Sequence, residues 1–239
     1  MGNQNNEIML QVDSINTFYG KAQVLFDFSL EVSRGEVVAL LGRNGAGKST
    51  FFKSVVGIVA PISGNIIFNR TAIHDLPPHK TCALGLGYVP EDRRIFSRLS
   101  IMENLEVARQ PSRQGLKPWT PERLFRLFPN LGEKPDQYGA NLSGGERQML
   151  TIARTLMGNP QLIILDEPSE GLAPVILAEL AKTVGKLKAE GVAILMAEQN
   201  LNFAQTVCDR AYIIQRGRIR HQSALSDLSR EIYEKYLSI

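Results

Sequence analysis

Short apolar runs recur along the chain, and the residues around them separate two kinds of predicted strand. Residues 8–12 and 28–32 alternate apolar and polar positions, as strands with one buried face do. Residues 37–41 are wholly apolar and are followed at once by glycine, which is typical of a strand buried on both faces of a sheet. Residues 162–165 and 193–196 are apolar runs of similar length. The pattern therefore predicts a group of strands inside a core.

Helical stretches alternate with these buried strands. Residues 48–58 read as a helix that is expected to end near Gly57, and residues 174–188 read as another between the last two apolar runs. Fully buried strands that are separated by helices indicate a parallel sheet. The predicted fold class is therefore α/β with a mainly parallel sheet.

The middle of the chain, residues 97–158, is predicted to be mainly helical. Ser100 and Ser143 each precede a glutamate at the third helical position, which is a capping box, and Thr120 precedes a proline at the first helical position. The helix that begins after Ser143 is expected to stop at Gly158. We interpret this stretch as a helical subdomain inserted into the α/β core.

Composition excludes several classes of protein. The 239 residues are 44% hydrophobic and 21% charged, with a net charge of +3, and the basic residues are spread out, so we expect no nucleic-acid partner. No apolar run approaches the ~20 residues of a membrane helix, and residues 1–6 are polar, unlike a signal peptide. Cys82 and Cys208 have no ligand-like spacing and are expected to be free thiols in a reducing cytosol.

A phosphate-binding motif follows the buried strand at 37–41. It consists of Gly42, Arg43, Asn44, Gly45, Ala46, Gly47, Lys48, Ser49 and Thr50. The glycines let successive backbone N–H groups converge on phosphate oxygens, and the N-terminus of the following helix adds about half a positive charge. We expect Lys48 to bridge the β- and γ-phosphates and Ser49 to bind Mg²⁺. A glycine-rich turn with an incidental Lys-Ser pair is the alternative.

Two adjacent carboxylates end the apolar run at 162–165. A buried strand would deliver Asp166 and Glu167 to its carboxyl edge, where α/β folds bind ligands. We expect Asp166 to hold Mg²⁺, directly or through water, and Glu167 to orient and deprotonate the attacking water. The alternative is that these acidic residues only cap the following turn.

A second glycine-rich anion site lies far from the first in sequence. It consists of Leu142, Ser143, Gly144, Gly145, Glu146, Arg147 and Gln148. Ser143 at a helix N-cap, followed by two glycines, leaves a hydroxyl and backbone N–H groups free to receive a phosphate. Because the chain already has a complete phosphate loop, two chains that share two nucleotides explain both sites most simply. Locally, the stretch could also do no more than start a helix.

Together these motifs resemble those of the ATP-binding subunits of ABC transporters, over essentially the whole chain. The signature sequence of that family matches residues 142–148 without substitution. The resemblance implies a P-loop NTPase core with a mainly parallel sheet, an N-terminal antiparallel β subdomain and an inserted α-helical subdomain. It implies one ABC ATPase domain over residues 7–239, with the core at about 7–91 and 159–239 and the helical subdomain at about 92–158.

The same resemblance implies ATP and Mg²⁺ as ligands. The nucleotide-binding residues expected outside the first loop are Tyr19, Glu91, Ser143, Gly144, Gly145 and Glu146. Tyr19 would stack on adenine, although it could also be a half-buried strand tyrosine. The groove near Glu91 would receive a coupling helix from a membrane subunit.

A finer resemblance rests on residues 90–96, 168–174 and 197–200. These stretches look like one of the two ATPase subunits of branched-chain amino-acid importers, a group that includes urea and short-chain amide importers. The implied partners are a second ATPase subunit, favoured to be a different chain, integral membrane permease subunits and, indirectly, a solute-binding protein. The implied location is cytoplasmic, peripheral on the inner face of the membrane.

Three residues depart from the general ABC pattern. Glu91 stands where glutamine usually contacts Mg²⁺ and water, Ala173 where aspartate usually crosses the dimer interface, and Gln199 where histidine usually touches the γ-phosphate. The amide of Gln199 can donate the same hydrogen bond but cannot carry a positive charge. We therefore expect Gln199 to act beside Glu167 and hydrolysis to survive.

Two other readings remain open at this point. The chain could power export of lipid or lipopolysaccharide, although the stretches at 168–174 and 198–200 argue against this. It could also be an ABC ATPase that remodels nucleic acid or ribosomes. Such chains usually carry two ATPase halves or a long coiled-coil insert, and neither fits in 239 residues.

Overall fold

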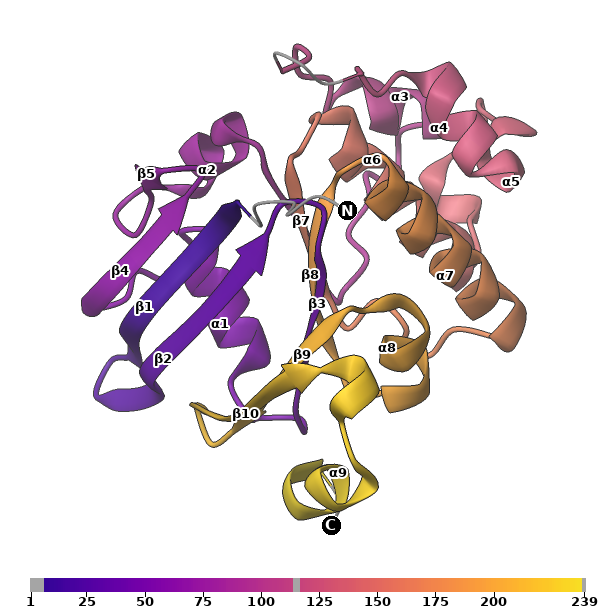
Figure 1. Cartoon of the computed structure of the whole chain (residues 1–239). Coiled ribbons are helices and arrows are strands. Elements are labelled where there is room, and N and C mark those ends of the chain that lie inside the picture. Colours follow the sequence, from indigo (N-terminus) through magenta and orange to yellow (C-terminus); the bar gives the residue numbers. More distant parts are fainter. Residues whose placement is uncertain (1–6, 114–116, 238–239) are drawn as a thin grey trace, which may run out of the picture.

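Two sheets organise the chain in the computed structural model, which describes residues 7–113 and 117–237 (Figure 1). The prediction made for residues 1–6 lies outside the described part. The first sheet is antiparallel, with the strand order β2-β1-β4-β5. Its strands are β1 (Ile8–Tyr19), β2 (Ala22–Ser33), β4 (Ser63–Phe68) and β5 (Thr71–Ala72). The alternating segments predicted near the N-terminus thus lie inside longer strands.

The second sheet has six strands in the order β10-β9-β3-β8-β7-β6, and all its pairs except β9–β10 are parallel. The strands are β3 (Val37–Leu41), β6 (Leu86–Val89), β7 (Leu162–Asp166), β8 (Ala193–Glu198), β9 (Arg210–Gln215) and β10 (Arg218–Ala224). Every residue of β3, β7 and β8 is buried. The predicted fold class, a mainly parallel sheet with strands covered on both faces, is confirmed.

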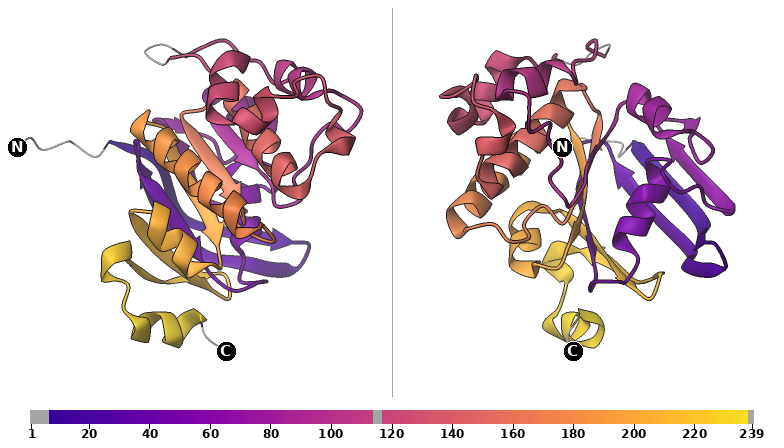
Figure 2. Two further views of the ribbon diagram at one scale, coloured as in Figure 1. Left: turned by 90° about the vertical axis from the view of Figure 1, so that its right-hand side faces the viewer. Right: turned by 180° about the vertical axis from the view of Figure 1, so that it is seen from behind.

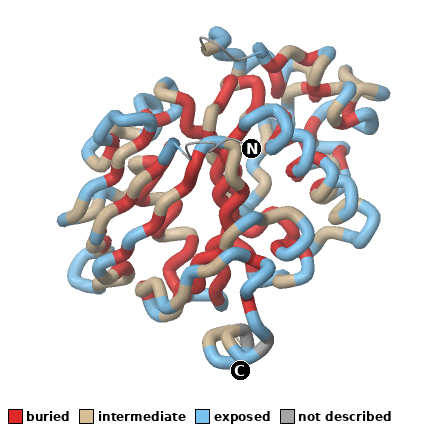
Figure 3. Tube along the Cα trace, viewed as in Figure 1, coloured by how far each residue is buried: buried red, intermediate tan, exposed pale blue. Residues whose placement is uncertain are grey.

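Helices cover both faces of the six-stranded sheet. Helix α1 (Lys48–Val55) lies between the two sheets, and α7 (Pro174–Ala189) and α8 (Leu201–Val207) lie on the opposite face (Figures 1 and 2). Phe51 of α1 stacks on Phe28 of β2 with ring centroids 4.4 Å apart. Burial follows this layering, because buried residues line the central strands and exposed residues line the outer turns (Figure 3). Ala46 of the phosphate loop and Phe51 and Phe52 of α1 belong to the hydrophobic cluster that includes residues of both sheets.

A group of helices lies towards one end of the molecule (Figure 1). They are α3 (Ile101–Glu106), α4 (Pro121–Leu127), α5 (Pro129–Gly132) and α6 (Gly144–Met157). Both predicted capping boxes, at Ser100 and Ser143, are present, and Thr120 caps α4 as expected. Helix α2 (Pro78–Leu84) lies beside β6, and α9 (Arg230–Leu237) lies near the C-terminus. The boundary of the helical insert, at about 92 and 158, stays a prediction.

The end of helix α1 lies near Gly57, as the sequence predicts, although the helix stops short of Ile58. It ends at Val55, and Gly57 adopts a left-handed φ of 83°. A Cβ at Gly57 would lie 2.1 Å from the carbonyl oxygen of Leu76, so only glycine allows the chain to turn here. No helix in the described part of the chain is long and apolar enough to cross a membrane.

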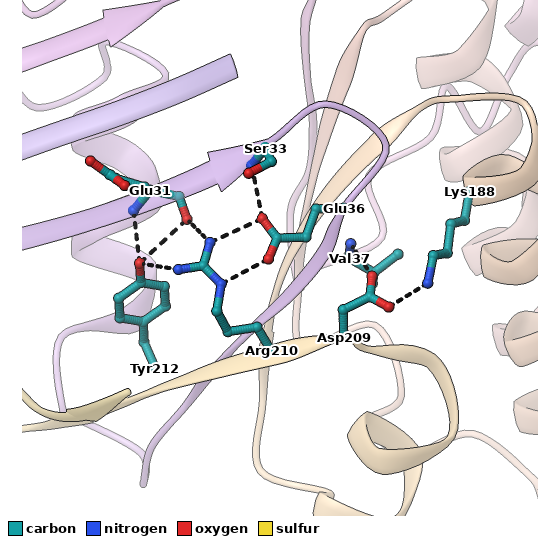
Figure 4. Close-up of polar contacts among 8 residues, drawn as sticks. All are labelled: Glu31, Ser33, Glu36, Val37, Lys188, Asp209, Arg210 and Tyr212. Carbon is teal, nitrogen blue, oxygen red and sulfur yellow. Dashed lines mark hydrogen bonds and ion pairs between the residues drawn. The ribbon is translucent and has the colours of Figure 1, made fainter. Parts of the chain in front are cut away.

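A polar network joins the antiparallel sheet to the six-stranded sheet (Figure 4). Arg210 at the start of β9 makes a bidentate ion pair with Glu36, at 2.7 and 2.9 Å, and donates to the backbone oxygen of Glu31 in β2 at 2.9 Å. Tyr212 accepts a hydrogen bond from Arg210 at 2.7 Å and one from the backbone of Glu31 at 3.1 Å. Hydrogen bonds from β9 to the Glu31 backbone therefore join the two sheets, and the ion pair with Glu36 fixes the guanidinium that makes one of them.

Candidate functional site

The phosphate loop leaves β3 and enters α1 through two glycines that no other residue can replace at the same geometry. A Cβ at Gly42 would lie 2.6 Å from Cγ2 and 2.8 Å from the carbonyl oxygen of Ile214. Gly47, at the N-cap of α1, has a φ of 113°. Residues 43–45 between them are exposed. The loop thus presents backbone N–H groups at a helix N-terminus, as an anion site requires.

Lys48 lies inside this loop with its side chain only 3% exposed. Its Nζ donates to the carbonyl oxygens of Gly42 at 2.7 Å and Arg43 at 3.1 Å. The same ammonium forms an ion pair with Oε1 of Glu167 at 2.9 Å. The structure therefore brings the predicted phosphate-binding lysine and the predicted base into direct contact.

Glu167 follows β7 with a left-handed φ of 47°, which is rare for a residue with a side chain and typical of functional sites. Its Oε2 accepts a hydrogen bond from Gln199 at 2.8 Å, and the same amide group donates to Oδ1 of Asn44 at 2.7 Å. Burial alone would raise the pKa of Glu167, but hydrogen bonds from Lys48 and Gln199 outweigh it and hold that pKa below its usual value. Glu167 is thus ionised at neutral pH.

Asp166, the last residue of β7, lies beside the start of α1. Its Oδ1 accepts a hydrogen bond from the Ser49 hydroxyl at 3.2 Å, and its Oδ2 accepts one from the Tyr88 hydroxyl at 3.2 Å. Burial raises the pKa of Asp166, partly offset by these two hydrogen bonds, and the nearby charges of Glu167 and Glu91 raise it further. A carboxylate and a hydroxyl oxygen that converge in this way suit Mg²⁺, which prefers hard oxygen ligands and fills its shell with phosphate and water.

The structure leaves two predicted contacts outside this cluster. The Tyr19 side chain is 46% exposed at the end of β1, and no contact with the loop is recorded for its ring. Glu91 is exposed, and it acts on the cluster through its charge rather than through a hydrogen bond. The adenine contact of Tyr19 and the ligand contact of Glu91 stay predictions.

The signature residues form the N-terminus of α6. The Ser143 hydroxyl accepts from the backbone N–H of Glu146 at 3.3 Å, and the Glu146 carboxylate accepts from the N–H of Ser143 at 2.8 Å and pairs with Lys134. Among the described residues, no hydrogen bond joins Ser143, Gly144, Gly145 or Glu146 to the phosphate loop. The two anion sites of one chain are thus separate, and the predicted sharing between chains stays a prediction.

Arg93 links the signature end of α6 to the turn after Glu167. Its guanidinium donates to the carbonyl oxygen of Glu170 and would lie 3.5 Å from a Cβ on Gly144. Glu170 itself hydrogen-bonds to Glu167, which raises the pKa of Glu170. The signature and the proposed catalytic turn therefore lie close together within one chain.

Sequence reasoning does not single out three side chains that the structure places in or behind this centre: Tyr88, Ser169 and Glu198. Tyr88 is the only residue with a polar tip in the short strand β6, which is a weak signal for a ligand-facing position. Ser169 and Glu198 fall in stretches that carry the family resemblance, yet nothing in the sequence indicates that their side chains meet. Their contact depends on the pairing of β7 with β8.

Comparisons with known proteins agree with this geometry. The family model described as ABC transporter matches residues 25–170. The high-affinity branched-chain amino acid transport ATP-binding protein BraG of Pseudomonas aeruginosa is 42% identical, over 88% of this chain and 91% of that protein. The lipopolysaccharide export system ATP-binding protein LptB of Escherichia coli is 38% identical, over 84% of each chain. A solved ABC transporter ATP-binding cassette in its ADP conformation superposes with a TM-score of 0.79 and 27% identity, over 95% of this chain and 97% of that one.

Proposed function

This chain belongs to the ABC transporter family, as an ATPase subunit that hydrolyses ATP, and on that premise we propose that it powers the uptake of branched-chain amino acids or related small solutes. The proposal of this cargo rests on the 42% identity to BraG over most of both chains. A likeness to the probable branched-chain amino acid transport protein LivF of Archaeoglobus fulgidus, 32% identical over 95% of this chain, supports it.

The proposed chemistry starts from the pair of Lys48 and Glu167. When Lys48 turns to the phosphates of ATP, Glu167 loses the cation that lowers its pKa and becomes a stronger base for the attacking water. Gln199, which already donates to Glu167, orients its carboxylate. Asp166 and Ser49 would hold Mg²⁺, which neutralises charge on the phosphates. Tyr88 keeps Asp166 in place, since burial raises the pKa of its hydroxyl and it stays a donor.

We propose that a second ATPase subunit completes each site. No hydrogen bond among the described residues joins the signature residues 143–146 to the phosphate loop of the same chain, and in this proposal a partner chain brings its own signature over the nucleotide. A different partner chain is favoured, because Ala173 and Gln199 replace the usual aspartate and histidine and a partner could supply both to the other site.

A groove between β6 and the helical insert supports a membrane-subunit partner. It encloses about 340 Å³, and its walls include Leu86, Gly87, Val107, Ala108, Arg154 and Pro160. Val107 is 57% exposed, and Tyr88, which contacts Asp166, forms part of the same wall. We propose that an amphipathic helix of the permease binds here, which would also place this chain on the inner face of the membrane.

Cysteine labelling tests the groove. Cys82 is exposed and lines it, whereas burial raises the pKa of the Cys208 thiol and keeps it protonated and slow to react. Maleimide should label Cys82 readily in the isolated chain and at least about tenfold more slowly in the purified transporter complex, with Cys208 slow in both. Equal labelling of Cys82 in the two samples would contradict the docking site.

The ATPase assignment of residues is tested on the purified chain. We expect Glu167→Gln to lower turnover by ~10²-fold or more while MgATP binding and any ATP-induced dimer persist. If this variant hydrolyses ATP near the wild-type rate, Glu167 is not the catalytic base. In parallel, Gln199→His restores the usual residue, and an unchanged rate would show that a charged donor is not needed at this position.

The cargo is tested in cells that lack this chain. Uptake of labelled leucine should be lost and should return with the wild type but not with Glu167→Gln, while urea and acetamide uptake and surface lipopolysaccharide stay unchanged. Lipopolysaccharide export is the second candidate, because LptB is 38% identical. Loss of surface lipopolysaccharide with normal leucine uptake would select it instead.

A further inference from the structure

Glu198 is a buried carboxylate behind the proposed catalytic centre. It ends β8 and is only 2% exposed. Its Oε1 accepts the backbone N–H of Ser169 at 3.1 Å, and its Oε2 accepts the Ser169 hydroxyl at 2.7 Å. No ion pair of the described residues includes Glu198. Ser169 thus gives both its donors to one side chain.

A buried carboxylate without a cation beside it is unfavourable in its charged form. Burial without a cation disfavours the charged form, and it raises the pKa of Glu198 to about 7 despite the hydrogen bonds from Ser169. A glutamine would avoid this cost, but it has one acceptor oxygen where Ser169 presents two donors. The backbone N–H of Asn200, 3.4 Å from Oε2, is a third donor to the same carboxylate. The need for two acceptors therefore accounts for a carboxylate at this position.

The two residues that this contact joins each neighbour a proposed catalytic group. Ser169 lies two residues after Glu167, in a turn that begins with a left-handed backbone at Glu167. Glu198 directly precedes Gln199, whose amide meets Glu167 at 2.8 Å. The backbone N–H of Glu167 also donates to the carbonyl oxygen of Ala197 at 3.2 Å, which adds a backbone link between the two segments. The Glu198–Ser169 contact is therefore placed to control the distance between Glu167 and Gln199.

We propose that Glu198 is a positioning residue, which clamps Ser169 and so holds the side chains of Glu167 and Gln199 in register for hydrolysis. The inference rests on the proposed roles of Glu167 and Gln199. Glu198 touches neither ATP nor water in this role. It acts through the two segments, since a displacement of about 1 Å at a catalytic group can cost ~10²-fold in rate.

Steady-state kinetics of four variants test the proposal. Glu198→Ala should lower kcat by about 10- to 100-fold with less than about a 3-fold change in the KM for ATP, because the loss falls on the chemical step. Glu198→Gln, which keeps the shape and one of the two acceptors, should recover only part of that rate. Ser169→Ala should be slower than wild type, and Glu198→Ala combined with Ser169→Ala should be no slower than Glu198→Ala alone. Glu133→Gln, an exposed carboxylate with no recorded side-chain contact, is the matched control.

A purely structural role predicts a different result. It would lower the fraction of folded, ATP-binding protein in Glu198→Ala while the kcat per bound site stays at the wild-type value. That outcome, or additive losses in the double variant, would overturn the proposal. If Glu198→Ala does not fold, Glu198→Gln and Ser169→Ala still decide it, since wild-type kcat in both would refute a clamp. Glu167→Gln is measured beside them, because its failure to slow turnover would remove the base assignment and leave the clamp to be judged separately.

Discussion

Removing the Glu36 carboxylate should lower the free energy of unfolding more than removing a surface carboxylate does. Glu36 and Arg210 face each other at 2.7 and 2.9 Å, with side chains only 14% and 20% exposed (Figure 4). Glu36→Ala leaves the guanidinium in a poorly hydrated place without its anion. Loss of one partner of a buried pair costs about 3–5 kcal/mol, and the residual exposure of this pair favours the lower end, about 3 kcal/mol.

Glu7 provides a matched control within the chain. It pairs with Arg34 at 3.3 Å and with Arg70 at 2.9 Å, but its side chain is 43% exposed. Exposed pairs contribute about 1 kcal/mol or less, so Glu7→Ala should change the free energy of unfolding little. Urea denaturation followed by circular dichroism gives both free energies from midpoint and slope.

A double-mutant cycle separates the pair from the unpaired charge. Arg210→Met combined with Glu36→Ala removes both ions, so it should cost at least about 1 kcal/mol less than the sum of the single changes. Arg210 also donates to Tyr212 and to the backbone of Glu31. These bonds are lost both in Arg210→Met alone and in the double variant, so the cycle cancels them. The reasoning would be refuted by a Glu36→Ala variant that loses no more stability than Glu7→Ala, or by single losses that simply add.

Two further predictions concern stability. Gly57→Ala should lower the free energy of unfolding in urea by about 2–4 kcal/mol, because its Cβ would meet the Leu76 oxygen at 2.1 Å on a left-handed backbone. Gly185→Ala, in α7 with open space around it, should instead raise that free energy by up to about 1 kcal/mol. Equal effects of the two substitutions would contradict this reasoning. Burial raises the pKa of Glu198 from 4.5 to about 7, so the folded protein binds more protons than the unfolded chain between these values and loses stability as pH rises through them. Relative to wild type, Glu198→Gln should therefore gain about 2–3 kcal/mol between pH 5 and pH 8, and a pH-independent difference would show that Glu198 does not titrate there.

Much of the fold could be predicted because its signals are local. The wholly apolar run at 37–41, the glycines that follow it and the capping boxes at Ser100 and Ser143 each depend on neighbouring residues. The end of α1 near Gly57 is a local signal too, since glycine is the residue most often found just after a helix. The structure adds that a Cβ at this position would meet the carbonyl oxygen of Leu76, which belongs to a later segment and which no local pattern reveals.

The sequence predicts some features of the candidate site and leaves others, the contacts between its side chains, unpredicted. The spacing from Gly42 to Ser49 and the pair Asp166-Glu167 after an apolar run predict a nucleotide, a metal ion and a base by sequence alone. Family resemblance also predicts Gln199 as a catalytic residue at the γ-phosphate, and that contact stays a prediction. Sequence reasoning has no means to predict that Lys48 pairs with Glu167 or that one amide joins Gln199 to both Glu167 and Asn44.

The amino-acid sequence alone specifies the local structures and the chemistry available in them: a phosphate loop, a carboxylate pair, a capped signature helix and buried strands. Which of these side chains meet depends on how the strands pair in the folded protein. The parallel pairing of β3, β7 and β8 brings residues near 41, 167 and 199 to one edge of the sheet, although more than a hundred residues separate the first from the others. Strand order and register arise from the packing of the whole core, and no local pattern of residues specifies them.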